Sequence, residues 1–196
     1  ITVFKGMGSF KDGNTIIISG EKKDEITAKY IIIATGSKPS SLSFIKIDKE
    51  RIITSTEALE LKEIPKHLII IGGGVIGLEL GQVYKRLGAE VSVIEYADRI
   101  TPVMDSALSR ELTKVMKKQK IKFHLSHQVN KVVRRGNNVY VTAVNKKGLE
   151  VSFEGDYCLV SVGIKPYTDK LNLAAAGVKL TQSVQIEVNN DLQTSN

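Results

Sequence analysis

Short apolar runs alternate with polar turns along the first third of the chain. Ile1–Lys5 and Thr15–Ser19 have the pattern of short strands, and the turn Asp12-Gly13-Asn14 separates them. Tyr30–Ile33 is rich in β-branched residues and predicts a buried strand that ends in a glycine turn. After a loop, Thr54–Glu57 supplies the polar start of a short helix.

The central part has the clearest pattern. Leu68–Ile71 predicts a buried strand, and the glycines Gly72–Gly74 follow it directly. Val75–Leu87 carries apolar residues at helical spacing and ends at Gly88, which is typical of a helix C-terminus. Val91–Glu95 is the next strand. Strand, helix and strand within about 30 residues predict a βαβ unit with two parallel strands and a right-handed crossover.

The second half begins with another helix and continues with strands. Asp105 is the expected N-cap, and the apolar stripe of this helix consists of Leu108, Leu112, Val115 and Met116. The period then changes to alternation, which predicts strands at Lys122–Leu125, Val129–Arg134, Val139–Val144, Leu149–Phe153 and Tyr157–Gly163. Tight turns join the second, third and fourth of these strands, so we expect a three-stranded antiparallel β-meander.

Composition narrows the class of protein. The net charge is +7, but the lysines are scattered and no nucleic-acid-binding motif accompanies them, so we expect a solvated surface and no nucleic-acid partner. Apolar runs such as Leu68–Ile71 are far too short to cross a membrane. The single cysteine, Cys158, excludes an internal disulfide and predicts a small buried hydrophobe. No targeting segment or metal site is predicted, and the expected compartment is cytoplasmic.

The glycines after Leu68–Ile71 form the pattern GxGxxG in the context that gives it meaning. The pattern follows a strand and opens a helix, and an acidic residue ends the next strand about twenty residues on. Gly72 permits the sharp turn, Gly74 lets a pyrophosphate approach the backbone, and Gly77 lets the helix pack closely on the sheet. Gly81 extends that smooth face. The free N–H groups of the helix N-terminus favour phosphate binding.

Glu95 indicates which dinucleotide binds. A carboxylate at the end of the second strand accepts hydrogen bonds from the adenosine ribose and repels a 2′-phosphate. Asp98 adds a second acid, and Arg99 is the only cation nearby. The sequence therefore predicts a Rossmann-like α/β domain that binds NAD in preference to NADP.

These motifs resemble the central domain of the flavoprotein disulfide reductases. The resemblance rests on Gly72-Gly73-Gly74-Val75-Ile76-Gly77-Leu78-Glu79-Leu80-Gly81, on Ile33-Ala34-Thr35-Gly36-Ser37-Lys38-Pro39 and on Val160-Ser161-Val162-Gly163-Ile164-Lys165-Pro166. Within that family the dihydrolipoamide dehydrogenase branch is the most similar. Its segments resemble Ser55–Leu59, Arg86–Gly88 and Thr101–Asp105. The resemblance covers essentially the whole chain in register.

The resemblance implies roles for individual residues. The NAD-binding set is expected to be Gly72, Gly73, Gly74, Val75, Ile76, Gly77, Glu79, Glu95, Val129 and Gly163. Within it, Glu79 matches the acid that positions the nicotinamide against the flavin, and Ile76 replaces a tyrosine that gates the pocket in NADPH-using relatives. Val129 and Gly163 match the adenine and nicotinamide sides. The backbone expected to touch FAD in the parent enzyme is at Gly8, Ala34, Thr35 and Gly36.

The resemblance also implies what a parent enzyme would add. It would oxidise dihydrolipoyl groups on carrier domains of a 2-oxoacid dehydrogenase or glycine cleavage complex, through a redox-active disulfide and FAD, to reduce NAD. The redox cysteines are expected ahead of residue 1, and the His-Glu acid–base pair in a later domain through which the parent forms a homodimer. We therefore expect residues 40–163 to be the NAD-binding domain, with partial FAD-domain flanks at 1–39 and 164–196. Such a fragment would bind NAD without turning over.

Two further details complete the expectation. Gly163–Tyr167 departs from the family, because arginine is usual in place of Ile164 or Lys165 and asparagine in place of Tyr167. This departure puts contacts at the domain boundary in doubt, but not dinucleotide binding. The three histidines are His67, His124 and His127. None has a catalytic partner in the sequence, so we expect surface positions and no catalytic residue.

Two alternatives stay open. The domain could come from another branch of the family, such as NADH oxidase, coenzyme A-disulfide reductase or mercuric reductase, and the cysteine region would distinguish them. The chain could instead be a free-standing NAD-sensing or scaffold module. That alternative requires closed ends, whereas both ends here have the pattern of severed strands.

Overall fold

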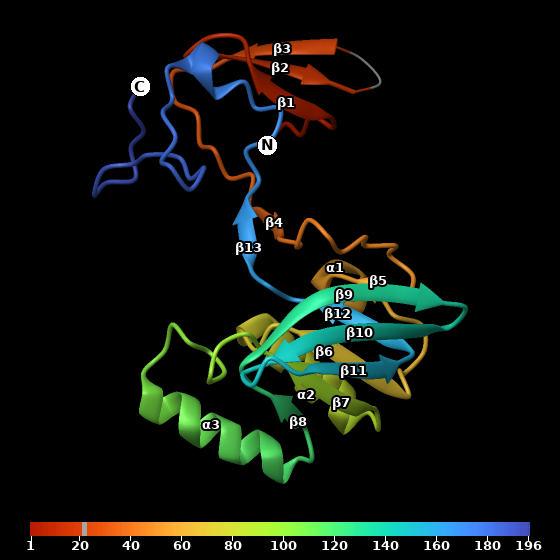
Figure 1. The fold of residues 1–196 in the computed structure, drawn as a ribbon. Helices are drawn as coiled ribbons and strands as arrows, with labels where there is room; N and C mark the ends of the chain where they lie inside the picture. Colours follow the sequence, from red (N-terminus) through yellow and green to blue (C-terminus); the bar gives the residue numbers. More distant parts are fainter. Residues whose placement is uncertain (21–22) are drawn as a thin grey trace. The chain divides into compact units, whose positions relative to one another are not determined.

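The chain folds into two compact units. The computed structural model describes residues 1–20 and 23–196. One unit combines Ile1–Lys38 with Lys165–Asn196, and the other is the continuous stretch Pro39–Ile164 (Figure 1). These bounds differ by one residue from the boundaries expected from the sequence. We call them the terminal unit and the central unit.

A five-stranded parallel sheet forms the middle of the central unit. Its strands lie in the order β5 (Ile52–Ile53), β12 (Tyr157–Val160), β6 (His67–Ile71), β7 (Glu90–Ile94) and β8 (Lys122–His124). Every neighbouring pair is parallel. The last of these five strands in sequence, β12, lies between β5 and β6. Because the strands are parallel, the carboxyl ends of β6, β7 and β12 lie side by side.

The two faces of this sheet are buried against different layers. On β6, Leu68 and Ile70 belong to one apolar core, whereas Ile69 and Ile71 belong to another. Because successive strand side chains point to opposite faces, an uninterrupted apolar run is required for a strand that is covered on both sides. The run from Leu68 to Ile71, with each residue at most 3% exposed, follows this rule.

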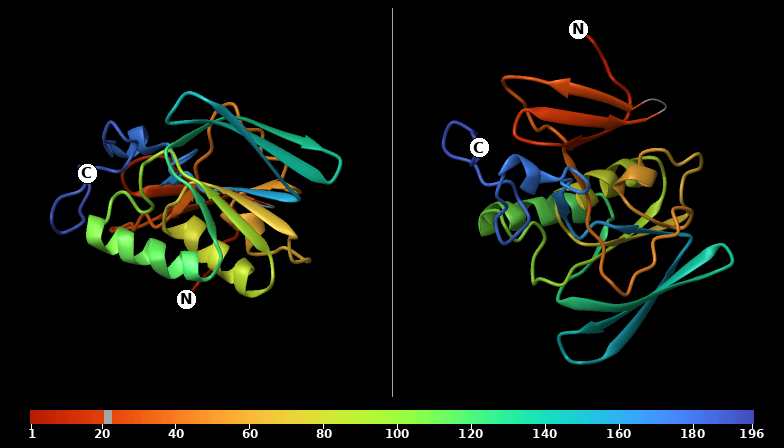
Figure 2. Two further views of the ribbon diagram at one scale, coloured as in Figure 1. Left: turned by 60° about the horizontal axis from the view of Figure 1, so that its bottom comes forward. Right: turned by 90° about the horizontal axis from the view of Figure 1, so that it is seen from above.

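Three helices contribute to the first core: α1 (Ser55–Ala58), α2 (Val75–Arg86) and α3 (Ser106–Lys118). Thr54 caps α1 in a reciprocal arrangement with Glu57, and the side chain of Asp105 caps α3. Both starts agree with the prediction from the sequence. Figure 2 shows α2 and α3 on the side of the sheet opposite the meander.

The meander covers the second face. It consists of β9 (His127–Arg135), β10 (Asn138–Asn145) and β11 (Glu150–Gly155), paired antiparallel in the order β11-β10-β9 (Figure 2). Its buried side chains Val129, Val139, Val141 and Ala143 pack with Cys158 of β12. Cys158 is fully buried, and this burial raises the pKa of its thiol. The predicted α/β class, parallel sheet and three-stranded meander are confirmed.

The terminal unit is a small β-structure closed by the C-terminal segment. β1 (Met7–Phe10), β2 (Thr15–Ser19) and β3 (Lys23–Thr27) form an antiparallel sheet. Phe10 packs with residues around the 3₁₀ helix η1 (Leu173–Ala176), and its backbone N–H donates to the Leu171 carbonyl at 2.8 Å. The two ends of the chain therefore share one core.

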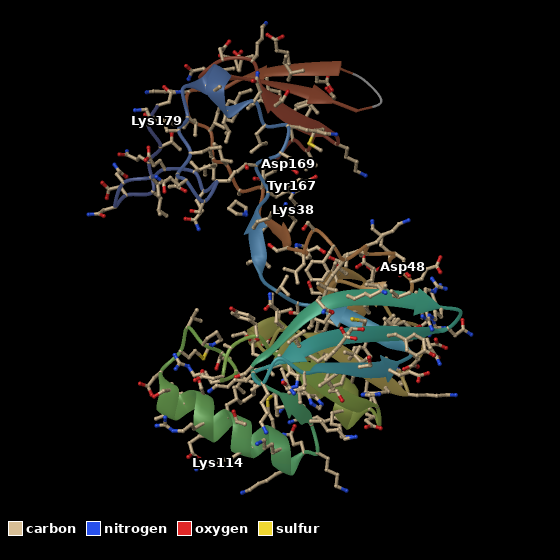
Figure 3. The ribbon with its side chains drawn as sticks, in the orientation of Figure 1. Lys38, Asp48, Lys114, Tyr167, Asp169 and Lys179 are labelled. Atoms are coloured by element: carbon tan, nitrogen blue, oxygen red, sulfur yellow. The ribbon has the colours of Figure 1, made fainter. Side chains whose placement is uncertain are left out.

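Polar contacts join the two parts of the terminal unit as well. Figure 3 shows Lys38, Tyr167 and Asp169 together. Lys38 pairs with the Asp169 carboxylate, and its ammonium group lies 5.1 Å from the centre of the Tyr167 ring. β4 (Ser37–Pro39) and β13 (Ile164–Pro166) form a two-stranded sheet where the chain passes from one unit to the other.

Several expectations for single elements were wrong. Ile1–Lys5 and Tyr30–Ile33 are not strands in the described part of the chain. Ile31 and Ile33 pack on the core of the terminal unit, while Tyr30 and Ile32 are 81% and 90% exposed, so the run is extended without a partner strand. The final buried strand ends at Val160 rather than Gly163.

The expected stripe of α3 is only partly the face that this helix buries. Leu112 and Met116 pack on the first core, whereas Leu108 and Val115 are 63% and 50% exposed. Ser109 is buried as well. The Ser109 hydroxyl lies 3.1 Å from that of Thr101, so a polar pair fixes the start of the helix. In the described part of the chain, no helix combines the length and apolar character needed to cross a membrane.

Candidate functional site

The turn between β6 and α2 depends on glycine at its first position. Gly72 has φ +105°, and a Cβ there would lie 2.3 Å from the Ser161 carbonyl oxygen, which follows β12. Its N–H donates to the Ile94 carbonyl at 2.9 Å. Only a glycine tolerates both this dihedral angle and this approach. Gly72 therefore brings the ends of three neighbouring strands together.

Gly74 leaves open space at the N-terminus of α2. It is the N-cap residue, no side chain caps the helix, and a Cβ on Gly74 would meet no atom within 4 Å. Gly74, Val75 and Ile76 all line a cavity of about 570 Å³. An uncapped helix N-terminus presents unsatisfied N–H groups and a partial positive charge, so this wall of the cavity favours an anion.

Gly77 and Gly81 serve packing. A Cβ on Gly77 would lie 2.7 Å from the Gly72 carbonyl oxygen and 3.0 Å from Cγ2 of Ile70. A Cβ on Gly81 would lie 2.7 Å from Cδ1 of the same isoleucine. The two glycines therefore form the smooth face on which α2 approaches β6.

Glu95 follows β7 and closes the cavity from the other side. One carboxylate oxygen accepts the Gly73 N–H at 2.6 Å, and the other accepts the Ala97 N–H at 2.7 Å. The side chain is partly buried and lines the cavity beside the glycine turn. Each carboxylate oxygen has a second lone pair, so both remain able to accept from ligand hydroxyls. The backbone thus fixes the orientation of the acid.

The cavity is mainly apolar and carries one acid. Its lining consists of Leu42, Phe44, Ile71, Gly72, Gly74, Val75, Ile76, Ile94, Glu95, Tyr96, Thr101, Pro102, Val103, His127, Gln128, Val129, Ser161, Val162, Gly163 and Ile164. Among these described residues there is no lysine or arginine. The guanidinium of Arg99 instead donates to the Pro102 carbonyl at 3.0 Å, and its side chain is exposed.

The structure brings most of the expected NAD-binding residues together. Those that line the cavity are Gly72, Gly74, Val75, Ile76, Glu95, Val129 and Gly163. Gly73 is buried behind the wall and contributes through its bond to Glu95, and Gly77 lies beneath the helix. Glu79 is exposed on α2 and does not line the cavity.

The residues expected to touch FAD lie in the terminal unit. Gly8 is in β1, where a Cβ would make only an ordinary contact of 3.6 Å with Ile16. Ala34, Thr35 and Gly36 are exposed. The hydroxyl of Thr35 donates to the Tyr167 carbonyl at 2.7 Å. These positions show no close backbone approach of the kind seen at Gly72, so their contact with FAD stays a prediction.

Sequence reasoning did not single out much of the wall. Leu42 and Phe44 come from a region assigned only as a loop, and Tyr96, Pro102 and Val103 lie between β7 and α3. Ile164 also lines the cavity, so the departure from the family at this position reaches the site as well as the domain boundary. For some of these residues the sequence did give an indication, because they follow predicted parallel strands, and loops at the carboxyl ends of such strands usually build the binding site.

The three histidines, expected as surface residues, are partly buried rather than fully exposed. Nε2 of His67 lies 2.9 Å from the Ser92 hydroxyl oxygen. The rings of His124 and Phe153 meet edge-to-face, with centroids 4.5 Å apart, and His127 lines the cavity. The contacts with Ser92 and Phe153 come from tertiary packing, which the sequence pattern of a short strand and turn did not indicate.

Comparison with known proteins identifies the family. All of residues 1–196 match the family model described as pyridine nucleotide-disulphide oxidoreductase, and the chain belongs to this family. It is 42% identical to the mitochondrial dihydrolipoyl dehydrogenase of Dictyostelium discoideum over 196 residues, covering 97% of this chain and 40% of the relative. It is 43% identical to dihydrolipoyl dehydrogenase 3 of Pseudomonas putida over 178 residues, covering 89% and 38%.

Solved structures agree with this assignment. LpdA of Mycobacterium tuberculosis matches with a TM-score of 0.85 and 28% identity, over 97% of this chain and 42% of that one. The HOCl-induced flavoprotein disulfide reductase RclA of Escherichia coli matches with 0.86 and 25%, over 99% and 43%. The resemblance inferred from the sequence motifs is confirmed. The chain spans about 40% of the length of these relatives.

Proposed function

We propose that the central unit binds NAD(H) in the cavity between the N-terminus of α2 and Glu95. The main support is Glu95, whose carboxylate lines the cavity while the Gly73 N–H holds it at 2.6 Å. A carboxylate fixed there accepts the ribose hydroxyls and repels a 2′-phosphate. The open space above Gly74 suits a pyrophosphate, which the free N–H groups of α2 attract.

The residues fit the cofactor in size and charge. A cavity of about 570 Å³ lies within the ordinary range for cofactor sites. Val129 and the apolar wall suit the adenine, and Gly163, with φ +123° and open space beside it, suits the nicotinamide side. When bound, the nicotinamide supplies hydride transfer. Ile76 lines the cavity. Glu79 does not line it, so Glu79 could position the nicotinamide ring only if part of the bound cofactor extended beyond the cavity.

For a parent enzyme we propose dihydrolipoyl dehydrogenase activity. It would use FAD, bound partly by the terminal unit, and a redox disulfide whose cysteines lie outside this chain. The support is the 42% and 43% identity to proteins of that name. Lipoylated carrier domains would then be the protein partners, and a homodimer the assembly. Residues 1–38 and 165–196 would complete an FAD domain. The chain alone is expected to bind NAD(H) without catalysing dihydrolipoamide oxidation.

Calorimetry with NADH and NADPH tests the proposed binding. NADH should bind and NADPH should bind much more weakly. Glu95→Ala should weaken NADH binding by roughly 1–3 kcal/mol, the scale of a lost hydrogen bond to a charged group. Asp98→Ala is the matched control, because Asp98 is an exposed acid nearby that does not line the cavity, and it should leave NADH affinity unchanged. Equal affinity for the two cofactors would refute the preference for NAD.

Gly74→Ala separates ligand binding from folding. The added Cβ would meet no protein atom, so stability should change by only about 0.5 kcal/mol. The methyl group would occupy the space proposed for the pyrophosphate, and this misfit should weaken NADH binding by about 1–3 kcal/mol. Thermal unfolding and calorimetry measure the two effects. Unchanged NADH affinity in this variant would contradict the proposed position of the phosphates.

A further inference from the structure

His127 opens β9 and reaches the proposed NAD site from the side opposite the glycine turn. Its backbone N–H donates to the Glu95 carbonyl at 2.9 Å, and the residue lines the same cavity. Two residues further on, Val129 lines the cavity at the proposed adenine wall. His127 therefore lies at the part of the cavity next to Glu95 and the proposed adenine wall.

The hydrogen bond of the His127 ring determines its tautomer. Nδ1 lies 2.7 Å from the Leu125 carbonyl oxygen. A carbonyl oxygen only accepts, so Nδ1 carries the proton and donates it. In the neutral ring Nε2 is then an acceptor. Within the described part of the chain, no other hydrogen bond to this ring is found, so the acceptor is available to a ligand.

Neighbouring rings hold the imidazole in place. The ring centroids of His127 and His124 lie 5.8 Å apart in an edge-to-face arrangement, and Phe153 lies 6.2 Å away in a similar one. Burial, and to a lesser extent the nearby His127, lowers the pKa of His124, so His124 favours its neutral form. A ring that is tied at Nδ1 and packed on two aromatic neighbours presents Nε2 in one orientation.

We propose that His127 determines base specificity, with Nε2 accepting a hydrogen bond from the exocyclic amine of adenine. Glu95 already accounts for the ribose hydroxyls, which leaves the base amine as the donor on this side of the ligand. A base with a carbonyl in place of that amine would set two acceptors against each other. This inference rests on the proposed NAD(H) binding and adds to it the recognition of the base.

Calorimetry with two reduced dinucleotides tests the inference on the 196-residue chain. The probes are NADH and its hypoxanthine analogue, in which a carbonyl replaces the adenine amine. The unmodified chain should prefer NADH by about three- to tenfold, the scale of one net hydrogen bond. His127→Leu removes the acceptor and keeps the bulk of the side chain, so the variant should bind the two dinucleotides with about equal affinity. His127→Gln keeps an acceptor on a side chain of similar reach and should retain part of it.

Gln128→Ala is the control, because Gln128 also lines the cavity and is the neighbouring residue. It should keep the full preference for NADH. If the preference disappears in this variant and persists in His127→Leu, the recognition belongs to Gln128 and the inference is wrong. Equal binding of the two probes by the unmodified chain also overturns it, while the proposed NAD(H) binding stands. If neither probe binds, the proposed function itself fails.

Discussion

Glycines after β6 differ in what surrounds them, although the sequence pattern treats them as one motif. At Gly74 a Cβ would meet open space, at Gly81 the flexible end of Ile70, and at Gly77 the backbone oxygen of Gly72. A side-chain end can move at small cost, but a backbone oxygen in a tight turn cannot. The effect of the same substitution should therefore depend on position.

Gly77→Ala should destabilise the chain, because the new Cβ would lie 2.7 Å from a backbone oxygen. We expect a loss of about 1–3 kcal/mol from overpacking, partly offset by about 1 kcal/mol of improved helix propensity. Gly81→Ala should cost less than Gly77→Ala, and Gly74→Ala should change stability by only about 0.5 kcal/mol. Thermal or urea unfolding of the three variants measures this order. A Gly77→Ala variant as stable as Gly74→Ala would contradict the close approach of α2 to β6.

His124 should make stability depend on pH. Burial first, and then the nearby His127 and Lys122, lower the pKa of His124 in the folded state. The unfolded chain, with a histidine pKa of about 6.5, therefore binds the proton more readily. The neutral form of His124 therefore contributes to the free energy of unfolding. This contribution is complete above about pH 6.5 and is lost as the pH falls toward the lower pKa of the folded state.

Unfolding by urea at several pH values measures this dependence. His124→Phe keeps an aromatic ring against Phe153 and cannot titrate, so its stability should fall less between pH 7 and pH 5. The same pH dependence in the His124→Phe variant and the unmodified chain would show that other groups cause it.

At the scale of elements, the sequence predicted those whose pattern depends on local chemistry. The β6–α2–β7 unit, the Asp105 cap and the meander turns each have a residue type that the backbone requires. Tyr30–Ile33 has the right composition for a strand but no partner, and β5, with two residues, exists only because β12 pairs with it. Pairing of this kind is a tertiary property, so short apolar runs do not reveal it.

The same distinction applies to the site. The glycine turn at Gly72 was predictable because its backbone conformation requires glycine. The acid Glu95 was predictable because the proposed ligand requires a negative charge at that position. The apolar wall was not, because Phe44, Val103 and Ile164 reach the cavity through loops whose course depends on the whole central unit. The place of His127 at the cavity was not predicted either, because the sequence indicated only a surface position. Its place depends on the turn between β8 and β9, where its N–H bonds to Glu95.

At the scale of the molecule, the two units differ in how the chain builds them. The central unit is continuous and contains two apolar cores, one on each face of its sheet. The terminal unit joins the first and last parts of the chain around Phe10, Leu171 and Leu173. Bringing distant segments together costs loop-closure entropy, which a folded central unit reduces by holding the intervening chain. We therefore expect folding of the central unit to favour folding of the terminal unit.

The terminal unit also exposes apolar side chains in one segment. Tyr30 and Ile32 are 81% and 90% exposed, in an extended segment without a partner strand. Exposed apolar side chains beside unpaired backbone promote association between copies. We expect the 196-residue chain to self-associate as its concentration rises, and Ile32→Ser to reduce that association without altering thermal stability.

Light scattering over a concentration series measures the association. Thr27→Ser is the matched control, because it changes an exposed polar residue near the segment without altering charge, and it should leave association unchanged. Ile33→Ser should behave differently again, because Ile33 packs on the core of the terminal unit and its loss should lower stability. A monomer at every concentration of the unmodified chain would show that this exposed segment is tolerated in water.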